Sequence, residues 1–184
     1  MNILLAITGG ISAYKAVDIV SGLKKNDCFV SVMQTPNSLN FVTEATIRNT
    51  ANKYYGWKID WGTPLHILAS EPENNIDVFI VVPATANTIA KMANGIADNL
   101  VTDTYLAIPN NVLKIVCPAM NTRMLNHPTV KRNLDILRDD NVIIIQPMEG
   151  LLACGTVGKG KLMTTKSLVE LIISVIKSKP KGKL

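Results

Sequence analysis

The sequence predicts an α/β protein with a three-layer αβα arrangement, in which helices cover both faces of a parallel sheet of Rossmann or flavodoxin-like type. Hydrophobic residues make up 47% of the chain and charged residues 18%, a balance typical of a sheet covered on both faces. Five apolar, β-prone runs are each followed by a helical pattern or a loop, and helical crossovers imply parallel pairing. We expect a single domain over residues 1–184.

The first run, residues 2–8, ends in Gly9 and Gly10, and Ser12 then precedes a helical pattern of apolar residues. Glycines let a backbone approach a ligand closely, and the amide groups that open a helix attract phosphate. The segment matches neither the GxGxxG nor the Walker A pattern, so a tight turn that needs glycine only for its geometry is an equal alternative.

The second run, residues 28–34, leads into Thr35 and Ser38, and a helix is expected to carry Phe41 and the apolar residues that follow it. Residues 51–70 have no clear pattern. His66 lies there among apolar neighbours, where a buried structural histidine is the more common case.

Residues 76–82 are almost all β-branched or aromatic and unbroken, as a central parallel strand requires. The small and hydroxylic segment 83–88 follows directly and leaves room for a flat ligand beside the sheet. A helix then ends near Gly95, and Asp98 and Asn99 open another helix.

Residues 113–117 form another predicted strand, which Pro118 should end because proline cannot donate to a sheet ladder. Asn121 should then project from the carboxyl edge of the sheet, where open α/β sheets bind ligands. The alternative is an asparagine that only caps a helix. A helix over 129–138 and a strand over 142–146 follow.

Four glycines interrupt the segment 147–163, which therefore resembles a mobile lid loop and contains Cys154. A closing helix is expected over 167–177. The basic tail 177–184 contributes four lysines to the net charge of +5, so we expect a solvated terminus and no nucleic-acid partner.

Cys28, Cys117 and Cys154 are widely spaced and include no CxxC pair, so we expect no metal site and a cytoplasmic location. We expect no membrane association, because no apolar run approaches the roughly 20 residues that span a bilayer.

Several motifs in this order resemble those of the homo-oligomeric flavin-containing cysteine decarboxylases, over about residues 2–163. The motifs are PATANT at 83–88 with KMANGIADNL at 91–100, PAMNTRM at 118–124, LHI around His66, LLACGTVGKG at 151–160 and, in support, TGGISAYK at 8–15. Two departures are Leu125, where the family commonly has tryptophan, and the segment 161–165.

The resemblance implies FMN as the cofactor, with its phosphate at the first two strand ends and its ring beside the segment 83–88. The implied cofactor-binding residues are Gly10, Ile11, Ser12, Thr35, Ser38, Ala84, Thr85 and Asn87.

Within the family, the resemblance is to members that decarboxylate 4'-phosphopantothenoylcysteine to 4'-phosphopantetheine in coenzyme A synthesis. It implies that the flavin oxidises the substrate to a thioaldehyde, that carbon dioxide leaves, and that the ene-thiolate is reduced again. His66 would be the base or the group that orients the reacting thiol, Asn121 would hold the carboxylate, and Cys154 would supply a proton. The implied substrate contacts are Asn121, Met120, Ala119 and Lys159.

The resemblance further implies a homotrimer, or a multiple of trimers, and a separate phosphopantothenate–cysteine ligase that supplies the substrate. Two alternatives are a peptidyl-cysteine decarboxylase of lantibiotic type, which would lack Cys154, and a non-catalytic flavin-binding regulatory subunit. A flavodoxin-like electron carrier would usually be acidic, whereas this chain is basic.

Overall fold

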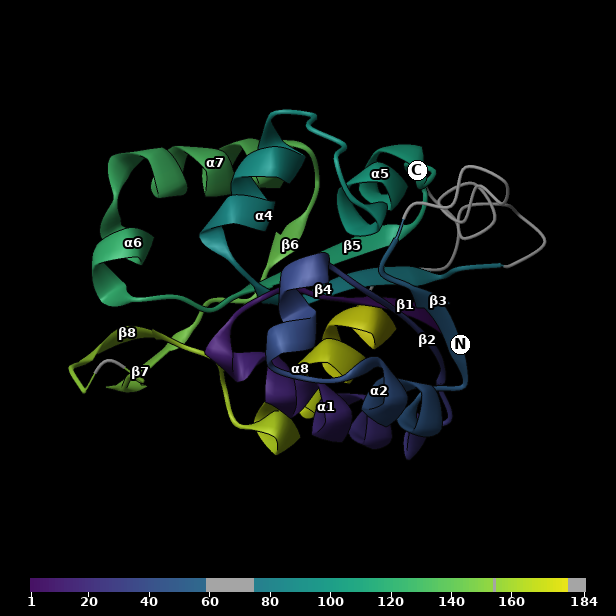
Figure 1. Ribbon diagram of the computed structural model, residues 1–184. Helices are drawn as coiled ribbons and strands as arrows, with labels where there is room; N and C mark the ends of the chain where they lie inside the picture. Colours follow the sequence, from purple (N-terminus) through teal and green to yellow (C-terminus); the bar gives the residue numbers. More distant parts are fainter. Residues whose placement is uncertain (59–74, 154, 179–184) are drawn as a thin grey trace.

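A six-stranded parallel sheet, in the order β3-β2-β1-β4-β5-β6, forms the centre of the molecule (Figure 1). The computed structural model describes residues 1–58, 75–153 and 155–178. This strand order is that of the Rossmann fold, and it confirms the predicted fold class. The strands are β1 (Asn2–Ile7), β2 (Phe29–Gln34), β3 (Lys53–Gly56), β4 (Val78–Ala84), β5 (Leu113–Pro118) and β6 (Ile143–Ile144).

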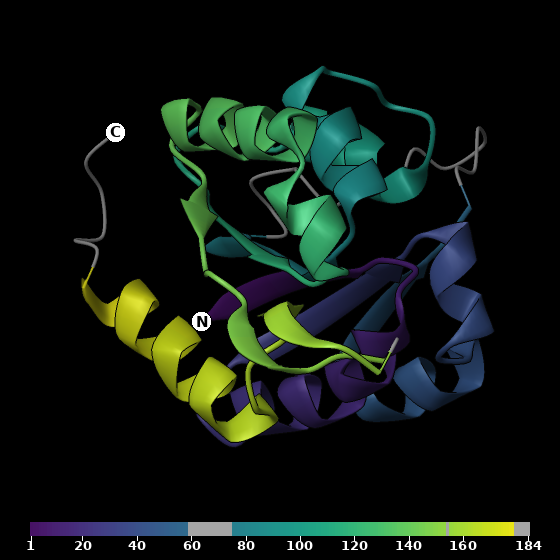
Figure 2. The ribbon, with the colours of Figure 1, turned by 90° about the vertical axis from the view of Figure 1, so that its left-hand side faces the viewer.

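Helices cover both faces of the sheet (Figures 1 and 2). One face carries α1 (Ala16–Lys24), α2 (Glu44–Thr50) and α8 (Thr165–Ser178). The other carries α4 (Ala86–Ala93), α5 (Leu100–Ala107), α6 (Thr122–Asn126) and α7 (Pro128–Asp139). Two short 3-10 helices, η1 (Ile11–Lys15) and η2 (Pro36–Asn40), follow the first two strands.

Alternation along β1 explains why both faces must be covered. Ile3, Leu5 and Ile7 belong to the hydrophobic cluster under α1 and α8, whereas Leu4 and Ala6 belong to the cluster under α4, α5 and α7. All five are essentially inaccessible to solvent. A strand that is apolar at every position requires this sandwich, because either open face would expose a hydrophobic surface.

Three elements differ from the sequence expectations or make them more specific. Helix α2 begins only at Glu44, because the Thr43 hydroxyl accepts a hydrogen bond from Thr46 N and caps it there; Phe41 therefore lies before the helix and is exposed. Strand β3 lies in the segment 51–70, for which the sequence indicated no specific element, and α6 is the asparagine-capped helix that the sequence offered as an alternative after Pro118.

Two strands within the segment 147–163 pair as an antiparallel hairpin, where a loop was expected. Its strands are β7 (Met148–Leu151) and β8 (Val157–Lys161). The hairpin lies beside α6 in Figure 1, and β8 contacts that helix. It is therefore docked against the rest of the protein in this structure.

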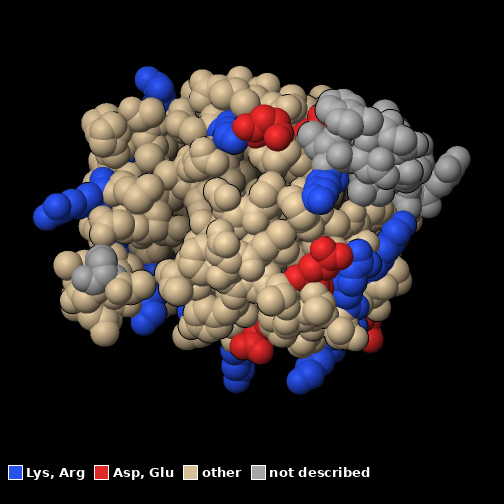
Figure 3. Space-filling view, in the orientation of Figure 1, with Lys and Arg blue, Asp and Glu red and all other residues tan. Residues whose placement is uncertain are grey.

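Among the residues described, no helix combines the length and apolar character that crossing a membrane would require. Charged side chains lie mostly around the rim of the face shown in Figure 3, and uncharged residues cover its middle.

Candidate active site

A cleft of about 900 Å³ opens at the carboxyl edge of the sheet, where the strand order reverses between β1 and β4. This reversal is the usual ligand site of open α/β sheets, because the loops that leave neighbouring strands there diverge to opposite faces. The cleft is lined by residues 9–12, 14, 15, 35–37, 83, 85–88, 91, 98, 99, 119–121, 124, 151–153, 160 and 161. Five separate segments of the chain therefore meet in it: the turn after β1, the end of β2, residues 83–99, the turn at Asn121 and the segment 151–161.

The glycine turn after β1 forms one wall. A side chain at Gly9 would collide with Asn37, whose Cβ would lie 2.5 Å from the added carbon. Gly10 has extended backbone, so it is not required for a left-handed conformation. An added Cβ at Gly10 would lie 3.5 Å from the Thr85 methyl group, within the space between two walls of the cleft.

The second wall comes from the end of β2. Thr35 lines the cleft, and its amide donates to the carbonyl of Ile7 at 2.9 Å. Ser38 is fully buried and does not line the cleft. Its hydroxyl donates to Thr35 O at 2.7 Å and accepts from the Gln34 side chain at 3.1 Å, so it shapes the turn from behind.

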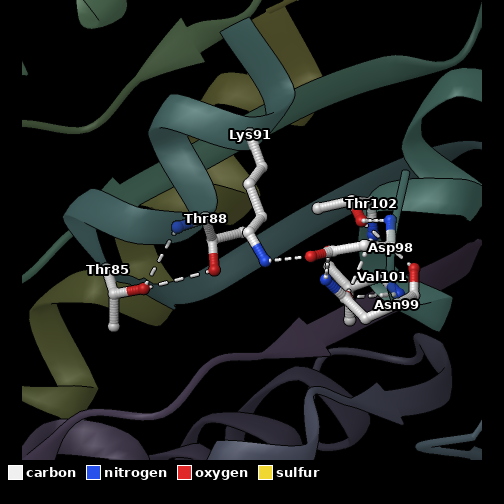
Figure 4. A network of polar contacts seen from close by, with 7 residues as sticks. All are labelled: Thr85, Thr88, Lys91, Asp98, Asn99, Val101 and Thr102. Carbon is white, nitrogen blue, oxygen red and sulfur yellow. Dashed lines mark hydrogen bonds and ion pairs between the residues drawn. The ribbon is translucent and has the colours of Figure 1, made fainter. Parts of the chain in front are cut away.

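The segment 83–88 forms the third wall. Thr85 caps α4, because its hydroxyl accepts a hydrogen bond from Thr88 N at 3.3 Å (Figure 4). Thr85 and Asn87 line the cleft. Ala84 is buried within β4 and pairs with Pro118, so it lies behind the lining.

Lys91 and Asp98 form an ion pair in the same wall (Figure 4), with a separation of 2.5 Å. Hydrogen bonds from Lys91 and then from Asn99 hold the pKa of the Asp98 carboxyl below its usual value. The side chain of Asn99 also accepts from Val101 N and Thr102 N, and thereby caps α5. The pair thus connects the end of α4 to the start of α5.

Two further lysines contribute positive charge to the cleft. Burial, and then the charge of Lys161, lower the pKa of Lys15. Lys161 lies at the end of β8 and also lines the cleft. Like charges gathered there favour the approach of an anion.

Asn121 both caps a helix and lines the cleft. Its side-chain oxygen accepts from Arg123 N at 2.8 Å and caps α6, and the residue lines the cleft together with Ala119 and Met120. The cap fixes the orientation of the side chain, so the capping role and a site role are compatible.

The hairpin provides the last wall through residues 151–153 and 160–161. Lys159 does not line the cleft; its carbonyl accepts a hydrogen bond from the Thr122 hydroxyl at 2.7 Å. His66 and Cys154 lie outside the described residues. His127 is exposed, and its Nδ1 accepts from Thr129 N at the start of α7.

Six of the eight predicted cofactor residues line the cleft: Gly10, Ile11, Ser12, Thr35, Thr85 and Asn87. Lys15, Lys91 and Asp98 also line the cleft, although the sequence did not single them out as site residues. The one signal for Lys15 was its position one helical turn after Ser12.

The cleft fits a flavin nucleotide on the chemistry of its walls. Gly10 leaves open the space that a Cβ would fill, next to the amide groups that open η1, and these suit a phosphate. Thr85, Ala86 and Met120 offer small or apolar surface for a flat ring. The volume of the cleft lies within the usual range of small-molecule and cofactor sites.

Comparisons with known proteins agree with the interpretation of the cleft as a flavin site. A curated relative from Bacillus subtilis, the coenzyme A biosynthesis bifunctional protein CoaBC, is 40% identical over 171 residues, which are 92% of this chain and 42% of the relative. This chain therefore spans less than half of that protein. A probable phosphopantothenoylcysteine decarboxylase from Streptococcus mutans is 37% identical over 172 residues, with 93% and 96% of the two chains covered.

Solved structures share the whole fold. A mutant PPC decarboxylase complexed with pantothenoylaminoethenethiol has a TM-score of 0.85 at 27% identity, covering 96% of this chain and 98% of that one. The FMN-binding protein AtHal3 has a TM-score of 0.83 at 28% identity, covering 97% and 98%. The profile of the Flavoprotein family matches residues 1–177. Together with the cleft at the β1–β4 reversal, these matches show that the chain belongs to the Flavoprotein family.

Proposed function

We propose that this protein is an FMN-dependent phosphopantothenoylcysteine decarboxylase of coenzyme A biosynthesis. The observation that carries the proposal is the meeting, in one cleft, of the glycine turn, the segment 83–88 and the Asn121 turn. The similarity to decarboxylases over almost the whole chain supports the same activity.

FMN would be held by the walls just described. The amides at the start of η1, with Ser12 and Thr35, would bind its phosphate, and Thr85 and Asn87 would contact the ring. When bound, FMN supplies the reversible two-electron chemistry that a cysteine carboxylate without a β-carbonyl requires before it can lose carbon dioxide.

The side chains of the protein would handle the proton and the carboxylate. His66 would take the proton of the substrate thiol or orient that thiol, since an imidazole can accept and donate protons under physiological conditions. The amide of Asn121 would hold the substrate carboxylate, with Ala119 and Met120 as neighbouring contacts. Cys154 would donate the proton needed to form the saturated product.

The charge of the cleft supports an anionic substrate. Lys15 and Lys161 both line it, and within the described part of the chain neither forms an ion pair. Lys159 is exposed and does not line the cleft, so it would meet only a part of the substrate that extends beyond the cleft.

For the assembled system, we propose a homotrimer, or a multiple of trimers, in the cytoplasm. A phosphopantothenate–cysteine ligase would supply the substrate. The segment 147–163, which we predicted to be a lid, would cover the bound substrate with its hairpin.

A peptidyl-cysteine decarboxylase is the alternative, since that activity would use the same flavin site. Cys154 favours the coenzyme A reaction, because a peptide-modifying enzyme that stops at the oxidised enethiol needs no proton donor there.

Two variants test the assignment. His66→Asn should release no carbon dioxide from 4'-phosphopantothenoylcysteine. Cys154→Ser should release carbon dioxide while failing to form 4'-phosphopantetheine, because loss of carbon dioxide precedes protonation. Cys28→Ser, at a buried thiol outside the cleft lining, is the matched control and should behave as wild type. Normal product from Cys154→Ser would contradict the proposed role of this cysteine.

A further inference from the structure

Thr8 lies immediately after β1, behind the lining of the cleft, and is completely buried. Its hydroxyl donates a hydrogen bond to the carbonyl of Pro83 at 2.7 Å and accepts one from the amide of Thr85 at 3.0 Å. Both partners belong to the segment 83–88, which forms a different wall of the cleft. The hydroxyl is therefore used as donor and acceptor at once.

The backbone of Thr8 is bonded to the opposite wall. Its carbonyl accepts a hydrogen bond from Gly10 N at 3.0 Å, and the carbonyl of Gly10 in turn accepts from Ala13 N at 2.8 Å within η1. One residue is thus connected to the glycine turn by its main chain and to the segment 83–88 by its side chain.

The sheet itself does not supply this connection. The pairing of β1 with β4 extends only from Ile3 opposite Val78 to Ala6 opposite Val81. Beyond Ala6 and Val81 the β1–β4 ladder has no further residue pairs. The two hydrogen bonds of the Thr8 hydroxyl then hold the turns together.

We propose that Thr8 is a positioning residue of the flavin site, whose hydroxyl sets the spacing between the glycine turn and the segment 83–88. This inference rests on the proposed binding of FMN. The phosphate and the ring of FMN lie at opposite ends of the molecule, so both walls must have the correct separation for both ends to bind together. The affinity of a ligand that contacts only one wall does not depend on the separation of the two walls.

The test compares FMN with riboflavin, which lacks the phosphate. Dissociation constants are measured by fluorescence titration of the full chain freed of flavin by dialysis. Thr8→Val keeps the shape of the side chain and removes both hydrogen bonds. We expect it to weaken FMN binding at least about tenfold, a factor equivalent to about 1.4 kcal/mol, and to change riboflavin binding less than about twofold.

Three variants complete the design. Thr8→Ser retains the hydroxyl and should restore the wild-type ratio of the two dissociation constants. Thr104→Val is the matched control for a buried threonine, because among the described residues the Thr104 hydroxyl has no hydrogen-bond partner. Thr8→Cys places a thiol, a weak donor and acceptor, at the same position, so its ratio of FMN to riboflavin dissociation constants should lie between those of wild type and Thr8→Val. If Thr8→Val does not fold, Thr8→Cys tests the inference in its place.

An equal loss of FMN and riboflavin affinity in the Thr8 variants would overturn the inference, because it would indicate a general loss of folded protein. A wild-type ratio in Thr8→Val, or in Thr8→Cys if Thr8→Val is unfolded, would overturn it as well. Failure of the wild-type protein to bind FMN would overturn the proposed function and this inference with it, so the two failures are distinguishable.

Discussion

The hydroxyl of Thr122 donates a hydrogen bond to the main-chain carbonyl of Lys159, across a distance of 2.7 Å. Next to it, Met120 N donates to Gly160 O at 3.1 Å. These two bonds fasten the hairpin to the turn that holds Asn121. Because the same hairpin lines the cleft, its docking sets the shape of the site.

Gly160→Ala should detach the hairpin. A Cβ there would lie 2.0 Å from the carbonyl oxygen of Met120, and the backbone φ of +138° also disfavours a side chain. We expect a loss of about 2 kcal/mol or more in the free energy of unfolding, measured by urea titration, and faster amide exchange over 157–161.

The control for that substitution is Gly56→Ala. Gly56 has a φ of +101°, but an added Cβ would meet nothing within 4 Å. It should cost only the backbone strain, about 1 kcal/mol. Equal losses from both substitutions would show that the close approach to Met120 does not matter.

Thr122→Val should loosen the hairpin, because it removes the hydroxyl that donates to the Lys159 carbonyl. Loss of one hydrogen bond, worth about 1 kcal/mol, should speed amide exchange in β8 about fivefold. Thr122→Ser retains the hydroxyl, so the amide hydrogens of β8 should exchange at the wild-type rate in that variant. If the valine variant also exchanges at that rate, the bond to Lys159 does not hold the hairpin.

Asp98→Asn should change how stability depends on pH. The pKa of Asp98 is lowered in the folded protein by the hydrogen bonds from Lys91 and Asn99. The ionised carboxylate therefore adds to the free energy of unfolding at pH values above the unfolded pKa of about 3.9. This added stability is lost as the pH falls through the lower pKa of the folded protein. The carboxylate is half exposed, so the contribution at pH 7 should be only about 0.5 kcal/mol.

The measurement is urea unfolding of both proteins between about pH 7 and pH 2, across the window in which an aspartate titrates. The difference in unfolding free energy between wild type and Asp98→Asn should shrink toward zero as the pH falls. A difference that is constant over this range would exclude the ion pair as its source.

Cys117 should resist alkylation in the folded protein. It is fully buried at the end of β5, and burial raises its pKa to about 12. At pH 8 only about one thiol in ten thousand would be ionised, and the thiolate is the reactive form. Burial also raises the pKa of Cys28.

Iodoacetamide labelling of Cys154→Ser at pH 8, followed by peptide mass spectrometry, checks this expectation. Both remaining cysteines should stay unmodified until urea is added. Rapid labelling of the Cys117 peptide under native conditions would contradict the burial of β5.

The sequence was sufficient where one local pattern dominates. Strand β4 follows from an unbroken run of β-branched and aromatic residues, and β5 ends at Pro118 because proline cannot donate to the ladder. The positions of Gly10, Thr85 and Asn121 in one cleft followed from a single rule about the carboxyl edges of parallel strands.

The remaining features depend on contacts between distant segments. Helix α6 is too short to show a hydrophobic period, and β3 is a short edge strand. Gly160 looked like a flexible loop residue, whereas its contact with Met120 makes it part of a docked strand. The bonds from Thr8 to Pro83 and Thr85 join residues more than seventy positions apart, so no sequence pattern could predict them.

The most direct test of the central claim is mass spectrometry of the products formed by the flavin-loaded protein from 4'-phosphopantothenoylcysteine, with no added oxidant. The proposed function predicts 4'-phosphopantetheine with release of carbon dioxide, and a flavin that is oxidised again after each turnover. An enethiol product two hydrogens poorer would contradict the redox-neutral reaction and favour the peptide-modifying class. No turnover by flavin-loaded protein would contradict the assignment as an enzyme.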